Sequence, residues 1–296
     1  MLVGVLVAAC EKDALRPDLI YVSISGFGST GPSASRRVYD SVIQAMAGMA
    51  GLQAPGGTEP QMVRTVLADK VTAQTAAQAI TAALLERERS GQGQHVHVSM
   101  LHAMVAWLWP DGMSNHTFVD DAGVHRTGGV SEASLVYRTS DGFIMACAVS
   151  DLEWRALCRA IGRPELGDDP RFSTMPERIR HTRAMRAILV EAFLTRTTQE
   201  WNEQLAGEDA VSAPIYAPGD VIDDPQVVAG NVLFESDHPV AGRIRQPEHP
   251  VTFERTPAVA SNRHAPTLGE HTDAILGELG VDPVEIARLR GSGVIA

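Results

Sequence analysis

The chain has 296 residues, of which 44% are hydrophobic and 21% are charged, and its formal net charge is −11. A chain of this length and apolar content can bury a large core, and we expect it to form two lobes. The acidic surface argues against nucleic acid or an anionic membrane as the main partner, because both are bound by positively charged surfaces.

The first third of the chain alternates between strand-like and helix-like segments. We expect a buried strand within 18–32 that ends in the glycines 26, 28 and 31, a helix over 39–52 with Asp40 as its N-cap, a strand over 62–68, a helix over 72–89 and a third strand over 95–100. Strands that alternate with helices in this way predict a parallel α/β sheet.

The remainder of the chain has a mixed pattern that predicts a smaller α+β domain and helices at the C-terminus. After a polar connection over 110–132, we expect a hairpin over 134–149 with its turn at 140–142, helices over 151–161, 176–194 and 198–205, strands over 232–235 and 251–255, and two final helices, the second with Asp282 as N-cap and Pro283 at its first position.

Asp69 is the residue on which a functional interpretation depends. It lies where an apolar run becomes the long helix, and that helix has no other acid until Glu86. The unpaired N–H groups and the dipole of a helix N-terminus stabilise negative charge. From spacing alone, Asp69 is either a helix cap or a carboxylate nucleophile that forms a covalent acyl intermediate.

Other candidate sites have structural interpretations of equal or greater weight. The glycines do not form the GxGxxG pattern that opens a dinucleotide-binding helix. His95 and His97 share one strand face, which suits solvent-exposed polar residues better than a metal site, and we expect no metal. Arg178, Arg180, Arg183 and Arg186 give one helix a basic face, either a solvated surface or a phosphate site. The three cysteines lack CxxC spacing, and we expect a reducing cytoplasm.

Several stretches together resemble the class III CoA-transferases, also called the CaiB/BaiF family. They occur in the family's order: DLIYVSISGFGSTGP, VYDSVIQAMAG, VLADKVTA with AALLERERSGQGQHVHVSML, DDPRF, VIDDPQV and LGEHTDAILGELG. The resemblance covers the chain from about Asp18 to the C-terminus. It implies an acyl-CoA and a small carboxylic acid as substrates, no permanently bound cofactor, and an interlocked homodimer.

The resemblance also implies roles for individual residues. The family nucleophile matches Asp69, whose carboxylate would form a mixed anhydride and then an aspartyl-CoA thioester. The segment from Arg37 through Val38 and Tyr39 to Asp40 resembles one that contacts CoA, and the Gly128–Gly129 loop would cover the site. Related racemases have a histidine at the position of Tyr39, and tyrosine is a poor base near neutral pH, so acyl transfer is favoured.

The chain differs from the family at its N-terminus, because relatives begin with an additional βαβ layer. We therefore expect a shortened, partly Rossmann-like large domain over 1–128, a small domain over 129–255, and a C-terminal helical segment over 256–296 that returns to the large domain. The alternatives are a racemase-like relative, and a non-catalytic remnant or partner subunit.

Overall fold

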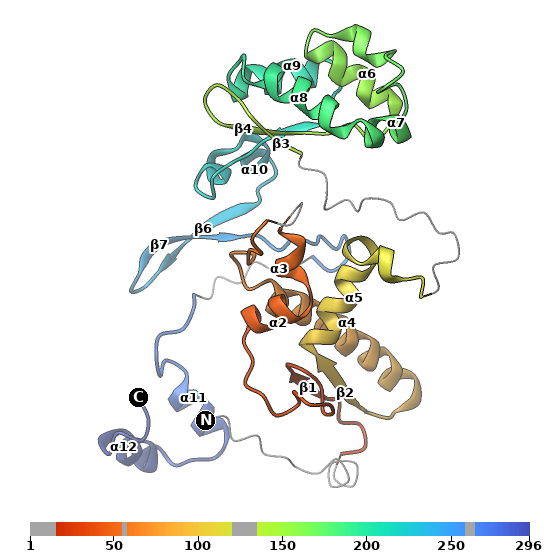
Figure 1. Ribbon diagram of the computed structural model, residues 1–296. Helices are drawn as coiled ribbons and strands as arrows, with labels where there is room; N and C mark the ends of the chain where they lie inside the picture. The colour runs from red at the N-terminus through yellow and green to blue at the C-terminus, as the bar shows by residue number, and fades with distance from the viewer. Residues whose placement is uncertain (1–15, 55–57, 120–134, 258–263) are drawn as a thin grey trace. The chain divides into compact units, whose positions relative to one another are not determined.

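The computed structural model describes residues 16–54, 58–119, 135–257 and 264–296 (Figure 1). The chain divides into two compact units, Met1–Leu135 and Val136–Ala296, which are described separately. The sequence-based division into three domains stays a prediction.

The first unit is built on a parallel pair of strands. Strand β1 (Tyr21–Ser25) runs beside β2 (His95–Ser99), with Tyr21 opposite His95 and Ser25 opposite Ser99. A parallel pair needs a long crossover connection, and the described part of this connection contains the helices α2 (Asp40–Met46), α3 (Met49–Leu52) and α4 (Leu67–Ser90). Helix α5 (Met100–Gly112) and the short 3-10 helix η2 (Ser114–His116) follow β2. The α/β character is confirmed, although in the described residues this sheet has only two strands.

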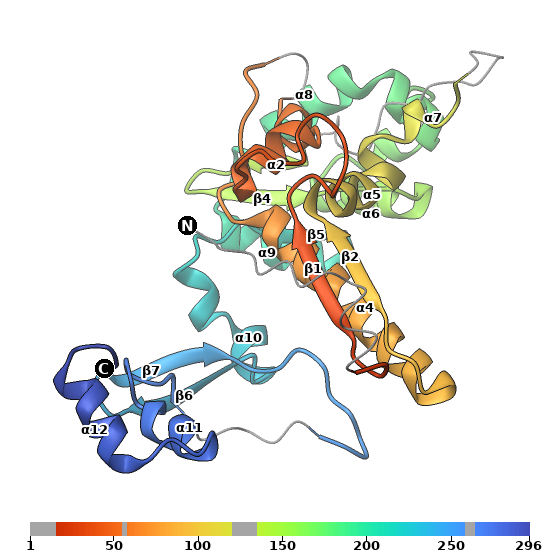
Figure 2. The same cartoon turned by 90° about the horizontal axis from the view of Figure 1, so that it is seen from below.

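Helix α4 packs against β2, α2 and α5 (Figure 2), and the core of the first unit is formed by side chains on or next to α2, α3, α4 and α5. The buried side chains of this core are Ile43, Ala47, Met49, Ala68, Val71, Ala103, Met104 and Leu108. The prediction of a buried β1 is wrong, because Ile24 is 55% exposed and Tyr21 is 37% exposed.

Residues 62–66 do not form the predicted strand, and α4 already begins at Leu67. The predicted helix over 39–52 is divided into α2 and α3 by Gly48, whose φ of +89° lies in the left-handed region. The turn after α4 is confirmed, since Gly91 ends the helix in a left-handed conformation with φ of +74°.

The second unit contains an antiparallel sheet in the order β3-β4-β5, formed by Val136–Arg138, Phe143–Ala146 and Ser212–Pro214. The predicted hairpin is therefore confirmed, and β5 adds a strand that the sequence did not indicate. The helices of this part are α6 (Asp151–Ala160), η4 (Pro164–Gly167), α7 (Met175–Arg180), α8 (Thr182–Phe193) and α9 (Thr198–Gly207). Its core includes Trp154, Phe172, Phe193 and Trp201.

The basic helix predicted over 176–194 is two helices, and its arginines do not form one solvated face. Arg178 is buried, with 2% of its side chain exposed, and its guanidinium lies 2.9 Å from Asp151. Arg180 pairs with Glu177 on the surface, and Arg186 lies over the Tyr137 ring. The buried arginine therefore has a structural partner within its own unit.

The last elements of the second unit are η5 (Asp220–Asp223), α10 (Pro225–Ala229), the antiparallel hairpin of β6 (Leu233–His238) and β7 (Gly242–Pro247), α11 (Thr272–Glu278) and α12 (Pro283–Gly291). The strand expected over 251–255 is wrong, and β7 lies earlier. Asp282 caps α12 as predicted, accepting a hydrogen bond from the N–H of Val284. In the described ranges, no helix has both the length and the apolar character needed to cross a bilayer.

Candidate functional site

Asp69 is the third residue of α4 and lies in its first turn. Its side chain is exposed, and the N-cap position is held by Val66, which has no capping side chain. In the described part of the chain, the Asp69 carboxylate has no hydrogen bond or ion pair. The structure therefore does not support the helix-cap interpretation, and the carboxylate is accessible to a ligand.

A different aspartate performs the capping function for α4. Asp40 is the first residue of α2 and is 9% exposed. Its Oδ2 accepts a hydrogen bond of 3.1 Å from the backbone N–H of Asp69. Its Oδ1 accepts a hydrogen bond from Nε2 of Gln44, one turn further along α2. The structure thus brings the predicted residues Asp40 and Asp69 together, although Asp40 is not the N-cap of its own helix, which is Tyr39.

Gln44 is a residue of this site that sequence reasoning missed. It is 1% exposed, and its Nε2 donates to the carbonyl oxygens of Val63 (3.3 Å) and Thr65 (3.0 Å). Its Oε1 accepts from the N–H of Val63 at 3.0 Å. The spacing of Asp40 and Gln44, four residues apart in one helix, is the only sequence signal that indicates the pair.

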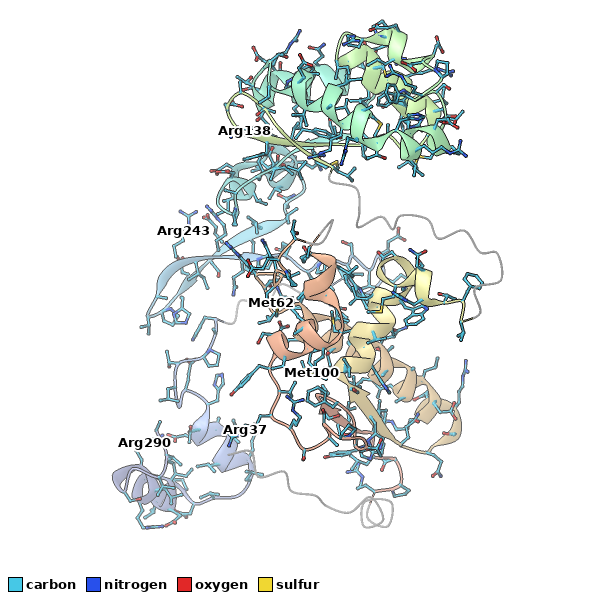
Figure 3. All side chains as sticks on the ribbon, viewed as in Figure 1. Arg37, Met62, Met100, Arg138, Arg243 and Arg290 are labelled. Carbon is cyan, nitrogen blue, oxygen red and sulfur yellow. The ribbon has the colours of Figure 1, made fainter. Side chains whose placement is uncertain are left out.

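The residues that precede α2 lie next to this arrangement along the chain. Arg37, labelled in Figure 3, is on the connection from β1 to α2, and its side chain is exposed. Val38 packs on Gly26, because a Cβ added to Gly26 would meet Cγ1 of Val38 at 2.5 Å. Tyr39 is 76% exposed. Through Asp40, this short segment is connected directly to the first turn of α4.

Beside Asp69, Lys70 donates a hydrogen bond of 2.8 Å from Nζ to Oγ1 of Thr65. Lys70 also lines one end of a groove of about 630 Å³ between α4 and α5. The groove is lined by Lys70, Val71, Gln74, Thr75, Gln78, Ala103, Ala106 and Trp107. Asp69 is not among these lining residues, so the groove begins next to the carboxylate without containing it.

Two further predictions concern the glycine loop and the histidines. Gly128 and Gly129 lie outside the described residues. His95 and His97 are exposed on β2, and the hydroxyl oxygen of Ser23 lies 2.9 Å from Nε2 of His95 and 3.2 Å from Nδ1 of His97. Among the residues that the structure describes, no group of three potential metal-ligating side chains (His, Cys, Asp or Glu) is present.

Comparison with known proteins gives one consistent result. The family model described as CoA-transferase family III matches residues 7–272. The chain is 30% identical to succinyl-CoA:glutarate CoA-transferase of Mus musculus, covering 96% of this chain and 66% of that protein. It is 29% identical to formyl-CoA:oxalate CoA-transferase of Streptomyces avermitilis, covering 95% of this chain and 72% of that protein.

The structural comparison agrees with the sequence comparison. A crystal structure of a CAIB/BAIF family protein from Brucella suis has a TM-score of 0.74 and 29% sequence identity, covering 92% of this chain and 71% of the solved one. The chain spans 66% of the length of the mouse relative. Because the family model matches most of the chain and the fold agrees, this chain belongs to CoA-transferase family III, the CaiB/BaiF family.

Proposed function

We propose that the chain acts in an acyl-CoA:carboxylate CoA-transferase, with Asp69 as the nucleophile. The observation that supports this proposal most strongly is the state of the Asp69 carboxylate. It is exposed and unbonded within the described residues, while the backbone N–H that a capping carboxylate would bind is bonded to Asp40. A carboxylate that makes no hydrogen bond within the described residues, and lies in the first turn of a long helix, suits attack on a thioester.

The proposed reaction balances without water or a redox partner. The Asp69 carboxylate attacks the thioester carbonyl carbon of an acyl-CoA, the C–S bond breaks, and CoA leaves as the thiolate. The thiolate attacks the aspartyl carbonyl carbon of this mixed anhydride, which releases the donor acid as its carboxylate. The acceptor carboxylate then attacks the carbonyl carbon of the aspartyl-CoA thioester, the C–S bond breaks, and CoA thiolate leaves as a second mixed anhydride forms between the acceptor and Asp69. The returning thiolate finally takes the acceptor acyl group and restores Asp69.

The charges next to Asp69 suit an anionic substrate. The dipole of the 24-residue helix α4 places partial positive charge at its first turn. Lys70 adds a full positive charge next to Asp69, and no carboxylate pairs with Lys70 within the described residues. In our proposal, Arg37 binds a phosphate or pantetheine oxygen of CoA, Val38 and Tyr39 line the thioester site, and the Gly128–Gly129 loop covers it.

The proposed substrates are an acyl-CoA and a small carboxylic acid, with CoA as a substrate and not a resident cofactor. The acceptors in the names of the two relatives, glutarate and oxalate, are both dicarboxylic acids. We therefore include a short dicarboxylic acid as the first acceptor to test. The interlocked homodimer and the cytoplasmic location stay predictions.

Mass spectrometry tests the proposal directly. Incubation with an acyl-CoA should add an acyl or CoA mass to the peptide that contains Asp69, and hydroxylamine should remove it. Asp69→Ala and Asp69→Asn should abolish the adduct and lower kcat by at least about 10³-fold, because the nucleophile is lost. Glu86→Gln is the matched control, since it removes an exposed acid from the same helix.

Three results would contradict the proposal. They are an Asp69→Ala protein that keeps its rate, an adduct on another residue, and an unmodified protein that never transfers CoA. Incorporation of solvent deuterium at the α-carbon of an acyl-CoA, without transfer, would instead identify the racemase-like alternative.

A further inference from the structure

We propose that Asp40 is a positioning residue for Asp69, acting through the backbone of α4 and not through contact with CoA or the reacting atoms. The inference rests on the proposed function and deepens it, because it assigns the orientation of the nucleophile to a specific residue. It rests on the bonds of the Asp40 carboxylate and on the burial of its surroundings.

Both oxygens of the Asp40 carboxylate are engaged inside the protein. Oδ2 accepts from the N–H of Asp69 at 3.1 Å, and Oδ1 accepts from Nε2 of Gln44. Asp40 is 9% exposed and Gln44 is 1% exposed, whereas the neighbouring Tyr39 is 76% exposed. Within the segment Arg37–Asp40, a ligand therefore meets the exposed side chains first, while the carboxylate of Asp40 is directed into the protein.

The bond to the Asp69 N–H fixes a part of the helix that would otherwise fray. The N–H groups in the first turn of a helix have no partner within the helix. Oδ2 of Asp40 supplies an acceptor for one of these N–H groups. Because the bond holds the backbone of Asp69 itself, it restricts the direction in which the Asp69 side chain leaves the helix.

Gln44 connects the segment before α4 to α2, the helix that also carries Asp40. Its amide group makes hydrogen bonds to the backbone of Val63 and Thr65. Beneath these bonds, Ile43 of α2 packs with Ala68 and Val71 of α4 in one buried core. The start of α4 is thus held to α2 at successive points along the chain. Such a supporting layer gives a reactive side chain a defined position.

Because both oxygens of the Asp40 carboxylate accept hydrogen bonds, the effect of replacing the carboxylate with an amide can be predicted. In Asp40→Asn, the side-chain carbonyl can replace one of the two acceptors, while the new NH₂ group faces the donor of the other bond. Gln44 cannot reverse its amide to compensate, because its Oε1 accepts from Val63 and its Nε2 donates to two carbonyl oxygens. Asp40→Ala removes both acceptors, so its effect should be larger.

The test compares Asp40→Asn, Asp40→Ala and Gln44→Leu in the full chain. We expect kcat to fall by about 10-fold in Asp40→Asn and by about 10²-fold in Asp40→Ala, since small displacements of a reacting group cost this much. The KM for acyl-CoA should change by less than about twofold, because no ligand contact is removed. The Asp69 adduct should still form in each variant, but more slowly. Exchange of the Asp69 amide hydrogen should accelerate by at least about tenfold in Asp40→Ala.

Asp141→Ala is the matched control in the other unit, as the counterpart of Asp40→Ala. The Asp141 carboxylate accepts from the backbone N–H of Thr198, at the start of α9, with a distance of 2.8 Å. This variant removes the same kind of bond, so it reports the general effect of loosening a helix start. Its kcat should stay within about twofold of the unmodified protein at a similar loss of thermal stability.

The outcomes separate this inference from the proposed function. Activity that survives in Asp69→Ala, or is absent from the unmodified protein, overturns both. Loss of activity in Asp69→Ala together with normal kcat in Asp40→Asn and Gln44→Leu overturns the positioning role alone. A raised KM with unchanged kcat in Asp40→Asn would make Asp40 a ligand-binding residue and would also overturn it. If Asp40→Ala does not fold, the other two variants and the exchange rate of the Asp69 amide decide the question.

Discussion

Gly26 packs directly against the side chain of Val38, because a Cβ placed on Gly26 would lie 2.5 Å from Cγ1 and 2.8 Å from Cβ and Cγ2 of Val38. Gly26 follows the carboxyl end of β1, which is where ligands approach a parallel sheet. The lack of a side chain at this position therefore lets the segment before α2, which contains the proposed CoA-binding residues, lie close to the end of the strand.

Gly26→Ala should displace Val38 and, with it, the neighbouring residues Arg37 and Tyr39. Overpacking of this kind costs about 1–3 kcal/mol of stability, and we also expect a raised KM for acyl-CoA. Gly51→Ala is the control, since a Cβ there meets nothing within 4 Å and the residue is helical. Urea denaturation and steady-state kinetics on both variants check the prediction. Equal behaviour of the two variants would show that the close contact has no consequence.

Arg37→Gln should weaken the binding of acyl-CoA without weakening the fold. Arg37 is exposed, and its side chain has no hydrogen bond or ion pair within the described residues. Loss of one charge-assisted contact to a phosphate corresponds to about a tenfold rise in KM or Kd. The salt dependence of binding should also become weaker. Arg36→Gln is the control, because Arg36 donates to Oγ of Ser33. Calorimetric titration with CoA measures the affinity of each variant. Equal affinities of Arg37→Gln and Arg36→Gln would contradict the proposal.

The sequence placed Asp69 near the start of a long helix, although α4 begins at Leu67 and not at residue 72, and it could not show which carboxylate caps that helix. Local spacing makes Asp69 the natural capping candidate, whereas the bond is supplied by Asp40, 29 residues earlier. A cap from a distant segment leaves no local pattern. For the same reason, Asp40 was predicted as the N-cap of α2, although its carboxylate is directed to α4 and to Gln44.

The predicted strand over 62–68 failed for a related physical reason. Val63, Val66 and Leu67 give this stretch the apolar character of a strand, and strands normally satisfy their backbone groups by pairing. Here the side chain of Gln44 bonds to the N–H and carbonyl of Val63 and to the carbonyl of Thr65. These bonds satisfy backbone groups that would otherwise pair with a neighbouring strand. Hairpin β3-β4 and helix α9 were predicted correctly because their turn and capping residues are local.

Arg178→Met should destabilise the second unit strongly. The guanidinium of this buried residue lies 2.9 Å from Asp151 and donates to the carbonyl oxygens of Phe172 (3.0 Å) and Val149 (3.2 Å). Methionine fills a similar volume but leaves these acceptors without a donor, at a cost of about 3 kcal/mol.

Arg180→Met is the matched control for this variant. Its side chain is 70% exposed and, among the described residues, pairs with Glu177 on the surface, where an ion pair contributes about 0–1 kcal/mol. The free energy of unfolding from urea titrations measures both effects. A loss below about 1 kcal/mol in Arg178→Met would contradict the structural role of the buried ion pair.

The stability of the second unit should fall at acid pH through two carboxylates. Hydrogen bonds from Arg171 lower the pKa of Asp169 from 3.8 to about 2. The backbone N–H of Thr267 and the ring of His264 lower the pKa of Glu270 from 4.5 to about 2. A pKa that is lower in the folded state stabilises the fold above the unfolded value, and this contribution is lost as the pH falls toward the folded value. The sensitive window is therefore about pH 4.5 to 2.

The variant Asp169→Asn/Glu270→Gln tests this window, because it removes both titrating groups. Its Tm should be lower than that of the unmodified protein at pH 7, where both carboxylates are ionised and bonded. The difference should shrink steadily between about pH 4.5 and pH 2 as the unmodified protein loses the same interactions. Glu86→Gln removes an exposed acid whose carboxylate makes no hydrogen bond in the described part of the chain. This variant should leave the fall of Tm at acid pH unchanged. A constant Tm difference across the window would show that these two carboxylates do not govern the acid response.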